Sequence, residues 1–441
     1  MPFTQKILEI AQSHPNRVAL ADSRDSLSYG DLVLNSPALY AAIEQLLLSI
    51  EKKEASYNES GIKANSRTVP TAIGDIPVVM ISLERALEAG ALVAMLAGYK
   101  IISSVLDPSW PLNHRIRSVR ESGARVLVTD DEGFVEALHK NDWHGAAVTL
   151  AQLKELIQKL SNRKAKKLEN AVDSADLQTP KVRRGDEPFI LIFTSGTTDA
   201  PKAFLRTRDS WRVNLRVSRK YLYAGCGMGT IAPGPLAYSL TLYALVEVLG
   251  TGGTIWLQSR FDPVEAVNLI DEGALERLVA VPAVLPALQI AARRKTSNLL
   301  SLKNAIVGGA NLSSKLRKDF KKIAQNCEIL SYYGAAEIGF IAYSKDGAGD
   351  LLNLFDGVEV QVRDSKGQKL PDGELGTLYV RVSSQGDQYI SASNNLKNAE
   401  LLITGPDGWS TVNDQARLIN GRLSLEGRAG DIAVTGGHNV S

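Results

Sequence analysis

The sequence predicts an α/β protein with a β-rich region toward its C-terminal end. Apolar runs typical of buried strands alternate with helix-like segments between residues 77 and 131, and again from Pro188 to about Tyr343. Beyond Lys345, short alternating strands are separated by Gly, Asp and Pro turns. Strand–helix alternation is typical of mostly parallel, helix-covered sheets, whereas closely spaced strands with turn residues form antiparallel sheets. We therefore predict two α/β units followed by a small β unit.

Each expected element follows from its local pattern. The first unit is expected to contain a strand at 77–83, an apolar helix at 86–98, a strand at 100–108, a helix at 115–123 and a strand at 124–131. Residues 151–160 indicate a helix, and residues 161–187 form a polar segment. The RKAKK run in this segment is interpreted as a solvated helix face, with a binding patch as the alternative. Strands of the last unit are expected at 358–364, 375–383 and 401–405.

The composition excludes several classes of protein. The 441 residues carry 50 basic and 48 acidic side chains, and 44% of them are apolar, which is typical of globular domains. A net charge of +2 argues against nucleic acid as a partner, because duplex binding needs a concentrated basic face. Cys226, Cys327 and the five histidines show no disulfide or metal-ligand spacing. Because we recognise neither a signal peptide nor an uncharged span of about 18 residues, we expect a cytoplasmic protein without a membrane span.

The most informative segment is PFILIF-TSGTTDAPK, residues 188–202, in which an apolar strand runs directly into a loop of small hydroxyl residues. Backbone amides of such a loop can surround phosphate oxygens, and a lysine side chain adds a point charge. The loop is not a Walker A motif, because no Gly-Lys-Ser/Thr tripeptide occurs. The alternative is an exposed Ser/Thr-rich connection that binds no ligand. The candidate phosphate-binding residues are Thr194, Ser195, Gly196, Thr197, Thr198 and Lys202.

The order TSGTTxxPK after an apolar strand resembles the phosphate loop of the adenylate-forming superfamily, which includes acyl-CoA synthetases and the adenylation domains of peptide synthetases. Further segments resemble the family's motifs, and they occur in the family's order across essentially the whole chain. These segments are HPNRVALADSRDSLSYGDL (14–32), VLDPSWPLNHRIRSVRESGARVLVTDD (105–131), VPAVLPAL (281–288), AIVGGANLS (305–313), SYYGAAE (331–337) and GWSTVNDQARLINGRLSLEGR (408–428).

The resemblance implies the architecture of the N-terminal domain of an adenylate-forming enzyme. Two helix-covered, mixed or parallel sheets are expected to pack together, with a small, barrel-like β subdomain attached. The expected parts are an α/β subdomain at 1–180, a second one with the phosphate loop and acyl pocket at 181–345, a β subdomain at 346–426 and a hinge at 427–441. Because the sequence stops just beyond this hinge, we expect it to be an N-terminal piece that lacks the family's C-terminal domain.

The resemblance also implies an activity. Family members use ATP and Mg²⁺ to convert a carboxylic acid to an acyl-adenylate, and they then transfer the acyl group, usually to a thiol. The chain is therefore expected to resemble an AMP-forming acid–thiol ligase (acyl-CoA synthetase), with CoA or the phosphopantetheine of an acyl or peptidyl carrier protein as acceptor. The substrate carboxylate attacks the α-phosphorus in line, so the protein positions groups and stabilises negative charge, and it needs no nucleophile of its own.

Matching positions imply the roles of individual residues. Tyr333 is expected to stack on adenine, Glu337 to bind Mg²⁺, and Asp414 to accept hydrogen bonds from both ribose hydroxyls. Arg428 is expected to contact ribose or phosphate. For Glu337, the alternative is an exposed carboxylate at a helix start. The residues expected to act in catalysis are Thr194, Lys202 and Glu337, and the other expected nucleotide-binding positions are Gly308, Gly309, Ala310, Tyr332, Gly334 and Ala335.

The residues expected to line the acyl pocket are Tyr238, Ser239, Gly308 and Gly334. Amino-acid-activating relatives place an aspartate at the position of Ser239, where it faces the ammonium group of the substrate. An unpaired buried ammonium would be costly, so α-amino acids are disfavoured and an aryl or fatty acid is expected. The neighbouring Leu240, Leu242 and Leu245 are interpreted as core residues, with a place in the pocket as the alternative.

Several positions depart from the family's pattern. They are Asp199 and Ala203 in and after the phosphate loop, Ala336 before Glu337, Val412 and Asn413 in place of Thr-Gly before Asp414, and Gly430 at the hinge. A negative charge beside a triphosphate is unfavourable unless it faces solvent or Mg²⁺. The hydroxyl lost at Ala336 costs roughly 0.5–1.5 kcal/mol, which alone would not abolish binding. Asp199, Ala336 and the expected lack of the C-terminal domain motivate the alternative function, a non-catalytic relative that binds a nucleotide or acyl-adenylate.

Overall fold

The computed structural model describes most of the chain and separates it into two compact units. The described residues are 2–59, 76–169, 178–194, 202–345, 351–383, 388–390, 403–404, 408–428, 433–435 and 438–440. Unit 1 consists of the described residues of Met1–Arg208 and Gly234–Arg260. Unit 2 consists of those of Asp209–Pro233, Phe261–Tyr389 and Glu400–Ser441. The subdomain boundaries expected at 180, 345 and 426 stay a prediction.

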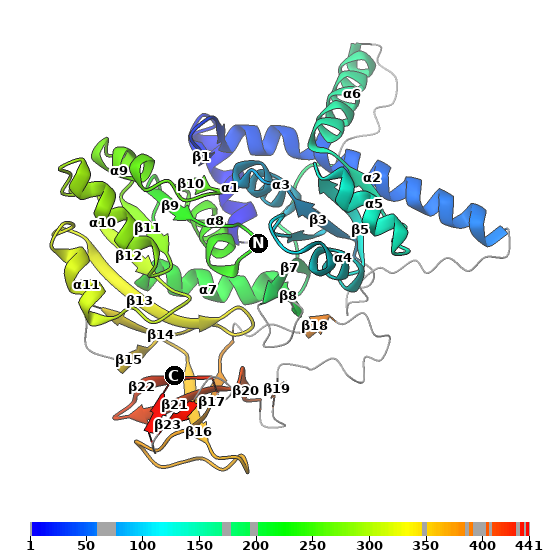
Figure 1. Cartoon of the computed structure of the whole chain (residues 1–441). Coiled ribbons are helices and arrows are strands. Elements are labelled where there is room, and N and C mark those ends of the chain that lie inside the picture. The colour runs from blue at the N-terminus through cyan, green and yellow to red at the C-terminus, as the bar shows by residue number, and fades with distance from the viewer. Residues whose placement is uncertain are drawn as a thin grey trace. The chain divides into compact units, whose positions relative to one another are not determined.

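Unit 1 is built on a mostly parallel sheet with strand order β8-β7-β4-β3-β5-β6 (Figure 1). Only the pair β7–β8 in this series is antiparallel. A smaller group joins β1 in parallel to β10 and antiparallel to β2. The strands are β1 (Val18–Ala21), β2 (Ser26–Ser28), β3 (Val78–Ser82), β4 (Ile102–Val105), β5 (Ala124–Thr129), β6 (Ala146–Val148), β7 (Pro188–Thr194), β8 (Lys202–Thr207) and β10 (Thr254–Gln258).

Helices cover the sheet of unit 1 on both faces. Every residue of β3, β4 and β5 is buried, as is typical of parallel strands between two helical layers. The helices are α1 (Pro2–Ser13), α2 (Tyr29–Glu59), α3 (Ala86–Leu96), α4 (Leu112–Glu121), α5 (Glu132–Lys140), α6 (Leu150–Glu169) and α8 (Ser239–Thr251). The strands and helices expected between residues 77 and 131 are confirmed. The polar segment expected after residue 160 begins instead with a continuation of α6 to Glu169.

One helix among the described residues, α2, is long and apolar enough over Tyr29–Lys52 to cross a membrane by length and composition alone. The core helix of a soluble protein passes the same test, and α2 contacts α1, α3, α6 and β5. The expectation that the chain has no membrane span therefore stays a prediction.

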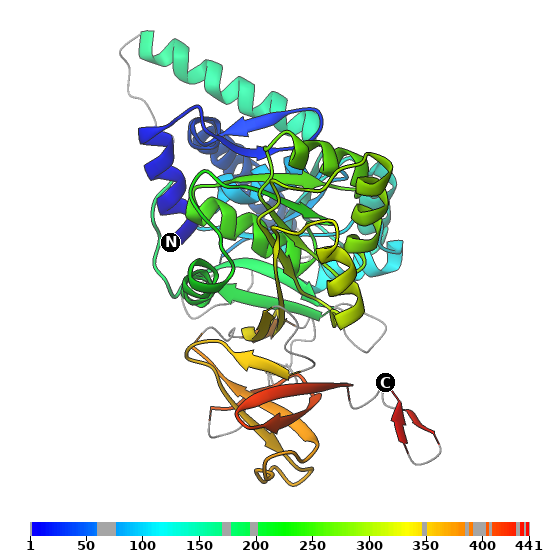
Figure 2. The same ribbon diagram turned by 90° about the vertical axis from the view of Figure 1, so that its left-hand side faces the viewer.

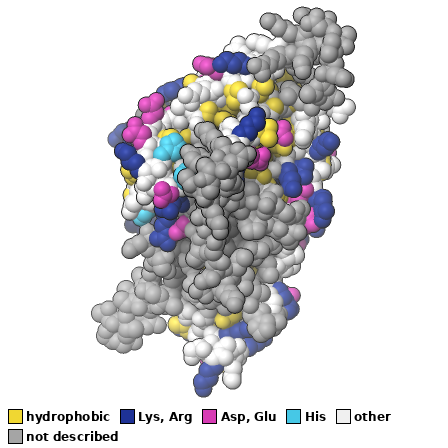
Figure 3. Space-filling model, turned by 90° about the vertical axis from the view of Figure 1, so that its right-hand side faces the viewer, with side chains coloured by type: hydrophobic (Ala, Val, Ile, Leu, Met, Phe, Trp, Pro, Cys, Tyr) yellow, Lys and Arg dark blue, Asp and Glu magenta, His cyan; other side chains and the backbone are white. Residues whose placement is uncertain are grey.

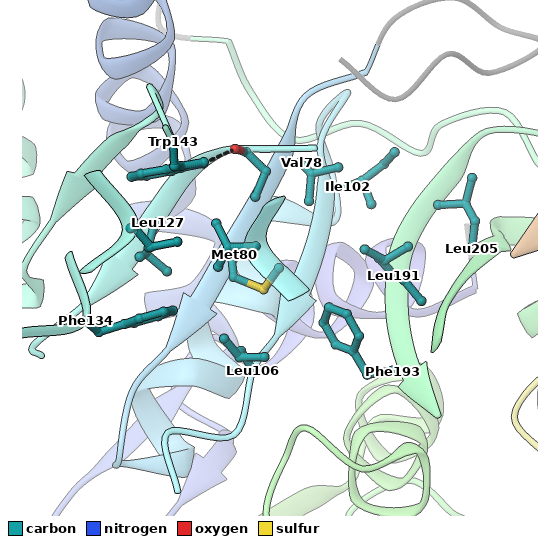
Figure 4. Packing of buried hydrophobic residues seen from close by; sticks show 14 of the residues in the cluster. Val78, Met80, Ile102, Leu106, Leu127, Phe134, Trp143, Leu191, Phe193 and Leu205 are labelled. Carbon is teal, nitrogen blue, oxygen red and sulfur yellow. Dashed lines mark hydrogen bonds between the residues drawn. The ribbon is translucent and has the colours of Figure 1, made fainter. Parts of the chain in front are cut away.

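One buried apolar cluster packs strands and helices of unit 1 together on one face of the sheet. Val78 and Met80 of β3 are two residues apart, so their side chains point to the same face of the sheet. They pack in one buried cluster with Phe134 of α5, Leu127 of β5 and Leu191 of β7 (Figure 4). The indole of Trp143 closes the edge of this cluster and donates a hydrogen bond from Nε1 to the Ala124 carbonyl oxygen at 2.9 Å.

In unit 2, a parallel sheet continues directly into an antiparallel one. The strand order is β9-β11-β12-β13-β14-β15-β22-β21-β17-β20-β19, and β16 pairs with β17. The pairs from β9 to β13 are parallel, and the order becomes antiparallel at β13–β14. Figure 2 shows the antiparallel strands in yellow, orange and red. The α/β class and the β-rich region after Lys345 are thus confirmed.

The elements of unit 2 begin with α7, whose first residue belongs to unit 1, and the unit 1 elements α8 and β10 lie between β9 and α9 in the chain. The helices are α7 (Arg208–Tyr221), α9 (Pro263–Asp271), α10 (Val284–Arg294) and α11 (Ser314–Lys321). The strands are β9 (Gly229–Pro233), β11 (Arg277–Ala280), β12 (Asn304–Val307), β13 (Glu328–Ala335), β14 (Gly339–Lys345), β15 (Leu351–Leu354), β16 (Glu359–Arg363), β17 (Gly376–Arg381), β19 (Ile403–Thr404), β20 (Ser410–Thr411), β21 (Asp414–Ile419), β22 (Arg422–Arg428), β23 (Ala433–Thr435) and β24 (His438–Val440). A short strand, β18 (Gln388–Ile390), lies at the boundary of the two units.

Charges of both signs are interspersed on the surface. On the described part of the face in Figure 3, Lys and Arg side chains lie among Asp and Glu side chains. Several of the exposed charges pair, as Arg381 does with Glu359 at 2.5 Å and Arg117 with Glu121 at 2.6 Å. Exposed pairs of this kind contribute little to stability, so we assign the stability of the fold to its buried apolar residues.

Leu127→Ala tests the core of unit 1. Leu127 is completely buried, so the truncation leaves a cavity and is expected to lower the free energy of unfolding by about 2–5 kcal/mol. The control is Val182→Ala at an exposed position, which should change it by no more than about 0.5 kcal/mol. The measurement is denaturant unfolding followed by circular dichroism. Equal effects of the two changes would contradict the assignment of the core.

Candidate functional site

The tip of the β13–β14 hairpin carries the residues of the SYYGAAE motif. Tyr332, Tyr333, Gly334 and Ala335 form the end of β13. Glu337 follows in the turn and is only 8% exposed, and the Ile338 amide donates a hydrogen bond to the Ala335 carbonyl oxygen at 3.1 Å. The alternative considered for Glu337, an exposed carboxylate at a helix start, is therefore wrong. Its carboxylate is held in a tight turn between two antiparallel strands.

Close packing of backbone explains the glycine at position 334. A Cβ atom at Gly334 would lie 2.5 Å from the carbonyl oxygen of Gly339 on the opposite strand, which is far inside van der Waals contact. The strand register also shifts between Tyr333 and Gly334, as in a β-bulge. Bulges re-aim the side chains beside them. The glycine therefore allows the local geometry that orients Tyr333.

The second glycine loop, GGA, lies beside the same hairpin in the sheet. It follows β12, and Val307 at the end of β12 pairs with Ser331 of β13. Gly308 is buried, and a Cβ atom there would lie 2.5 Å from the ring of Tyr332. Gly309 has a φ of +81°, which favours glycine, and like the following Ala310 it is exposed. The structure thus brings together the two glycine motifs that are expected to contact nucleotide and acyl group.

A hydrogen bond joins the two residues expected to bind adenosine. The Tyr333 hydroxyl donates to Oδ2 of Asp414 at 2.6 Å, across 81 residues of sequence, and both side chains are half-buried. Asp414 begins β21, and its register partner on β22 is Arg428. Tyr333, Asp414 and the backbone of Arg428 therefore belong to one part of unit 2. The structure does not describe the Arg428 side chain.

The residue before Asp414 explains one departure from the family's pattern. Asn413 stands where the resemblance expects glycine, and it has a φ of +64°. Asparagine is among the few non-glycine residues that tolerate this left-handed conformation. The backbone N–H of Asn413 donates a hydrogen bond to Oγ1 of Thr411 at 2.9 Å, which closes the turn. A glycine at this position could adopt the same left-handed conformation.

In unit 1, the phosphate-loop candidates lie at the end of the β7–β8 hairpin. Thr194 and Lys202 are register partners at the ends of the two strands. Ala203, another departure from the family's pattern, is 4% exposed and belongs to the apolar core cluster. The predicted Ser195, Gly196, Thr197 and Thr198, together with Asp199, lie outside the described residues, as does Gly430. The structure does not describe the side chains of Thr194 and Lys202.

The acyl-pocket candidates of unit 1 lie at the start of α8. Tyr238 is the N-cap residue and is 46% exposed, and Ser239 begins the helix, which has no acidic residue in its first turn. Leu242 and Leu245 are buried, as the core interpretation predicts, whereas Leu240 is half-buried.

An aromatic residue that the sequence analysis did not select contacts this position. Trp110 lies edge-on to Tyr238, with ring centroids 6.5 Å apart, and edge-on to Phe193 at 5.8 Å. The Nε1–H of Trp110 is directed at the Tyr238 hydroxyl at 3.4 Å. The only signal in the sequence was an aromatic residue in the LDPSWP segment, and nothing in the sequence linked it to residue 238.

The side chains available as metal ligands show whether the implied Mg²⁺ fits this protein. Among the residues that the structure describes, no group of three or more His, Cys, Asp or Glu side chains could hold a metal ion. A single carboxylate such as that of Glu337 fits Mg²⁺ if phosphate oxygens and water supply the other ligands, which is the usual arrangement for this ion with ATP. The buried thiol of Cys327 is unsuited as a nucleophile, because desolvation raises its pKa to about 12.

Glycine-rich loops at strand ends of a mixed α/β fold are typical of proteins that bind nucleotides at the carboxyl edge of a sheet. A family model described as AMP-binding enzyme matches residues 73–389. The chain belongs to this AMP-binding enzyme family. The resemblance to adenylate-forming enzymes is thereby confirmed.

Individual relatives agree with this assignment. Over 252 residues the chain is 31% identical to a candidate long chain fatty acid-CoA ligase, VraA of Staphylococcus epidermidis, covering 56% of this chain and 51% of VraA. It is 24% identical to pyochelin synthase PchD of Pseudomonas aeruginosa, covering 100% of this chain and 76% of PchD. The structure of ATP-bound MatB from Rhodopseudomonas palustris has the same fold, with a TM-score of 0.77 at 18% identity over 99% of this chain and 81% of MatB. The chain spans about half the length of the first curated relatives it matches.

Substitutions of Asn413 test the conformational argument. Asn413→Gly keeps the left-handed conformation accessible and should leave the free energy of unfolding within about 0.5 kcal/mol of the parent. Asn413→Val puts a β-branched residue at a φ of +64° and should cost about 1–2 kcal/mol. Both variants lose the amide side chain, so each serves as the control for the other in denaturant unfolding. Equal losses in both would show that the side chain, not the backbone angle, matters at this position.

Proposed function

We propose that the chain binds ATP and activates a carboxylic acid as an acyl-adenylate, which is then transferred to the thiol of CoA or of a carrier protein. The hydrogen bond between Tyr333 and Asp414 is the observation that carries this proposal most directly. This bond brings together an aromatic ring that can stack on adenine and a carboxylate that can accept hydrogen bonds from ribose. The chain that carries them belongs to the AMP-binding enzyme family. The name of VraA, a candidate long chain fatty acid-CoA ligase, supports CoA as the acceptor.

The proposed adenosine contacts use the acceptor capacity of Asp414. An ionised carboxylate has about four lone-pair sites, and the Tyr333 hydroxyl uses one of them. A carboxylate with this acceptor capacity can also accept hydrogen bonds from ribose hydroxyls, while the Tyr333 hydroxyl restricts its rotation. The Tyr333 ring would stack on adenine, because it is flat and half-buried. Arg428, opposite Asp414 in the β-ladder, would contact ribose or phosphate.

The proposed chemistry needs no protein nucleophile. The carboxylate oxygen of the substrate forms a bond to the α-phosphorus while the bond to pyrophosphate breaks, and pyrophosphate leaves with the electron pair. Thr194, Lys202 and the loop between them would bind the phosphates, and Glu337 would hold Mg²⁺, which neutralises phosphate charge when it is bound. Buried in its turn, Glu337 presents a carboxylate of restricted mobility.

The start of α8 supports an aryl or fatty acid as the substrate. Ser239 offers only a hydroxyl, and no carboxylate lies in the first turn to pair with an ammonium group. An α-amino acid would therefore lose the partner that its charge needs when it is desolvated. The name of VraA, a candidate long chain fatty acid-CoA ligase, agrees with an apolar acid. We also propose a cytoplasmic location, since the sequence holds only two cysteines, Cys226 and Cys327, and shows no disulfide framework, which suits a reducing compartment.

Thermal stabilisation by ligands tests the proposal. The panel contains AMP, ATP with Mg²⁺, and non-hydrolysable acyl-adenylate analogues with aryl, short aliphatic, long aliphatic and aminoacyl groups. At about 100 times Kd, a ligand that binds only the folded state stabilises it by about 2.7 kcal/mol, which gives a measurable rise in Tm. We expect AMP to stabilise the chain, and an aryl or long aliphatic adenylate to stabilise it further. This readout requires binding alone and no turnover.

The same panel separates the competing functions. No stabilisation by any nucleotide would contradict the proposed function outright. Stabilisation by the aminoacyl analogue above all others would contradict the assigned class of acid. Stabilisation by acyl-adenylates without pyrophosphate release from ATP and the matching acid would favour a non-catalytic binding protein.

Tyr333→Phe tests the link to Asp414. The change keeps the ring for stacking but removes the hydroxyl that holds the carboxylate, so recognition of ribose should weaken while adenine binding persists. The expected result is a loss of about threefold to tenfold in affinity for AMP, as for one hydrogen bond, and a smaller loss for 2′,3′-dideoxy-AMP. Tyr343→Phe, in the same sheet, is the control. Equal losses for AMP and the dideoxy analogue would contradict the ribose role.

A further inference from the structure

A cluster of three aromatic rings lies in unit 1, at the ends of two neighbouring parallel strands. β4 and β7 pair in parallel, so the chain that leaves each of them emerges at the same edge of the sheet. Trp110 follows β4, and Phe193 is the residue before Thr194 at the end of β7. Tyr238 joins them from the start of α8. Trp110, which belongs to none of the predicted site residues, contacts both of the other rings.

Trp110 occupies a rigid position. Asp107, only 5% exposed, accepts hydrogen bonds from the amide and hydroxyl of Ser109 at 2.9 and 2.6 Å, and its carbonyl oxygen accepts from the Trp110 amide at 3.2 Å. Pro108 and Pro111 restrict the backbone on either side. The indole also packs on the buried cluster of unit 1. The ring therefore has little freedom to move when a neighbour changes.

The side chain of Tyr238, by contrast, is exposed, and the described contacts of its ring and hydroxyl are with Trp110. Its backbone is fixed, since its amide donates to the Pro235 carbonyl oxygen at 3.2 Å and its carbonyl oxygen accepts from Leu242 at 3.0 Å. Its ring meets the indole edge-on at 71°, and its hydroxyl accepts the long bond from Nε1 at 3.4 Å. Nearly half of the side chain remains exposed, which leaves ring surface free for a ligand.

We infer that Trp110 is a positioning residue that fixes the ring of Tyr238 and thereby determines which acyl groups the chain accepts. This inference rests on the proposed function, in which Tyr238 lines the acyl pocket. An edge-on contact between aromatic rings favours one orientation of each ring over others. A fixed Tyr238 ring offers one flat apolar surface, which suits a planar aryl group better than a flexible aliphatic chain. Without Trp110, the Tyr238 side chain could populate other rotamers, and the preference among acyl groups would weaken.

The test measures affinities for AMP and for aryl- and long-alkyl-adenylate analogues with the full chain and four single variants. Trp110→Ala should reduce the ratio of aryl to alkyl affinity by about threefold to tenfold and leave AMP affinity unchanged, as expected for loss of one ring contact with its hydrogen bond. Trp110→Phe keeps a ring but no donor, so its effect should be smaller. Trp256→Phe, at a half-buried tryptophan elsewhere in unit 1, is the matched control and should leave the ratio unchanged.

The fourth variant, Tyr238→Ala, shows whether Trp110 acts through this tyrosine. In that background, Trp110→Ala should cause no further change in the aryl-to-alkyl ratio, because the ring that it positions is gone. Normal AMP affinity with an unchanged ratio in Trp110→Ala would overturn the inference and leave the proposed function intact. So would additive effects in the double variant. Failure of the parent chain to bind AMP would overturn the proposed function and this inference with it.

Discussion

The arrangement of unit 2 depends on the close approach of two backbones at the tip of the β13–β14 hairpin. The carbonyl oxygen of Gly339 lies where a side chain at residue 334 would have to start, so only glycine allows this distance between the strands. The hairpin is also the place where a parallel sheet becomes antiparallel. On one side it continues to the strand that carries the GGA loop, and on the other, through β15 and β22, to Asp414 at the start of β21. Any side chain at 334 would therefore disturb the orientation of Tyr333 toward Asp414.

A different constraint acts in unit 1, where the ends of buried parallel strands determine which residues meet. Apolar contacts fix these strands, so Trp110 after β4 and Phe193 within β7 lie at defined positions beside each other. The Asp107 carboxylate accepts a hydrogen bond from the Ser109 amide in the turn that leads to Trp110. The ring of Phe193, on the neighbouring strand β7, contacts the indole edge-on. The phosphate-loop candidates begin immediately after this support. The buried core of unit 1 thus supports Trp110, which contacts Tyr238, a residue to which we assign acyl contacts.

Much of the fold could be predicted from the sequence, because local patterns of apolar and polar residues indicate its strands and helices. Continuous apolar runs such as 77–83 and 124–131 identified buried strands, and β16 and β17 followed from alternation with turn residues. The RKAKK run after residue 160 was interpreted as a helix face, and α6 runs through it to Glu169, although the length of this helix was not predicted. The turn that holds Glu337 was also missed, because SYYGAAEIGF has no strong turn pair, and the glycines act through a contact between strands. The pairs Tyr333–Asp414 and Trp110–Tyr238 join residues far apart in sequence, and no local pattern encodes such contacts.

The departures from the family's motifs differ in their physical effect: some change packing or backbone conformation, and others remove a polar group. The methyl group of Ala203 is buried in an apolar cluster, so an alanine there adds core contacts in place of a glycine. Asn413 adopts the left-handed conformation that glycine would otherwise supply, and it leaves Asp414 in reach of Tyr333. Neither change removes a group that could touch a ligand. Of the described departures, Ala336 before Glu337 and Val412 before Asn413 each lack a hydroxyl that the family's pattern has, and the loss of one hydrogen bond of about 1 kcal/mol shifts affinity only several-fold. Burial explains the alanine at 203, and the left-handed backbone explains the asparagine at 413, so neither departure argues against adenylate formation.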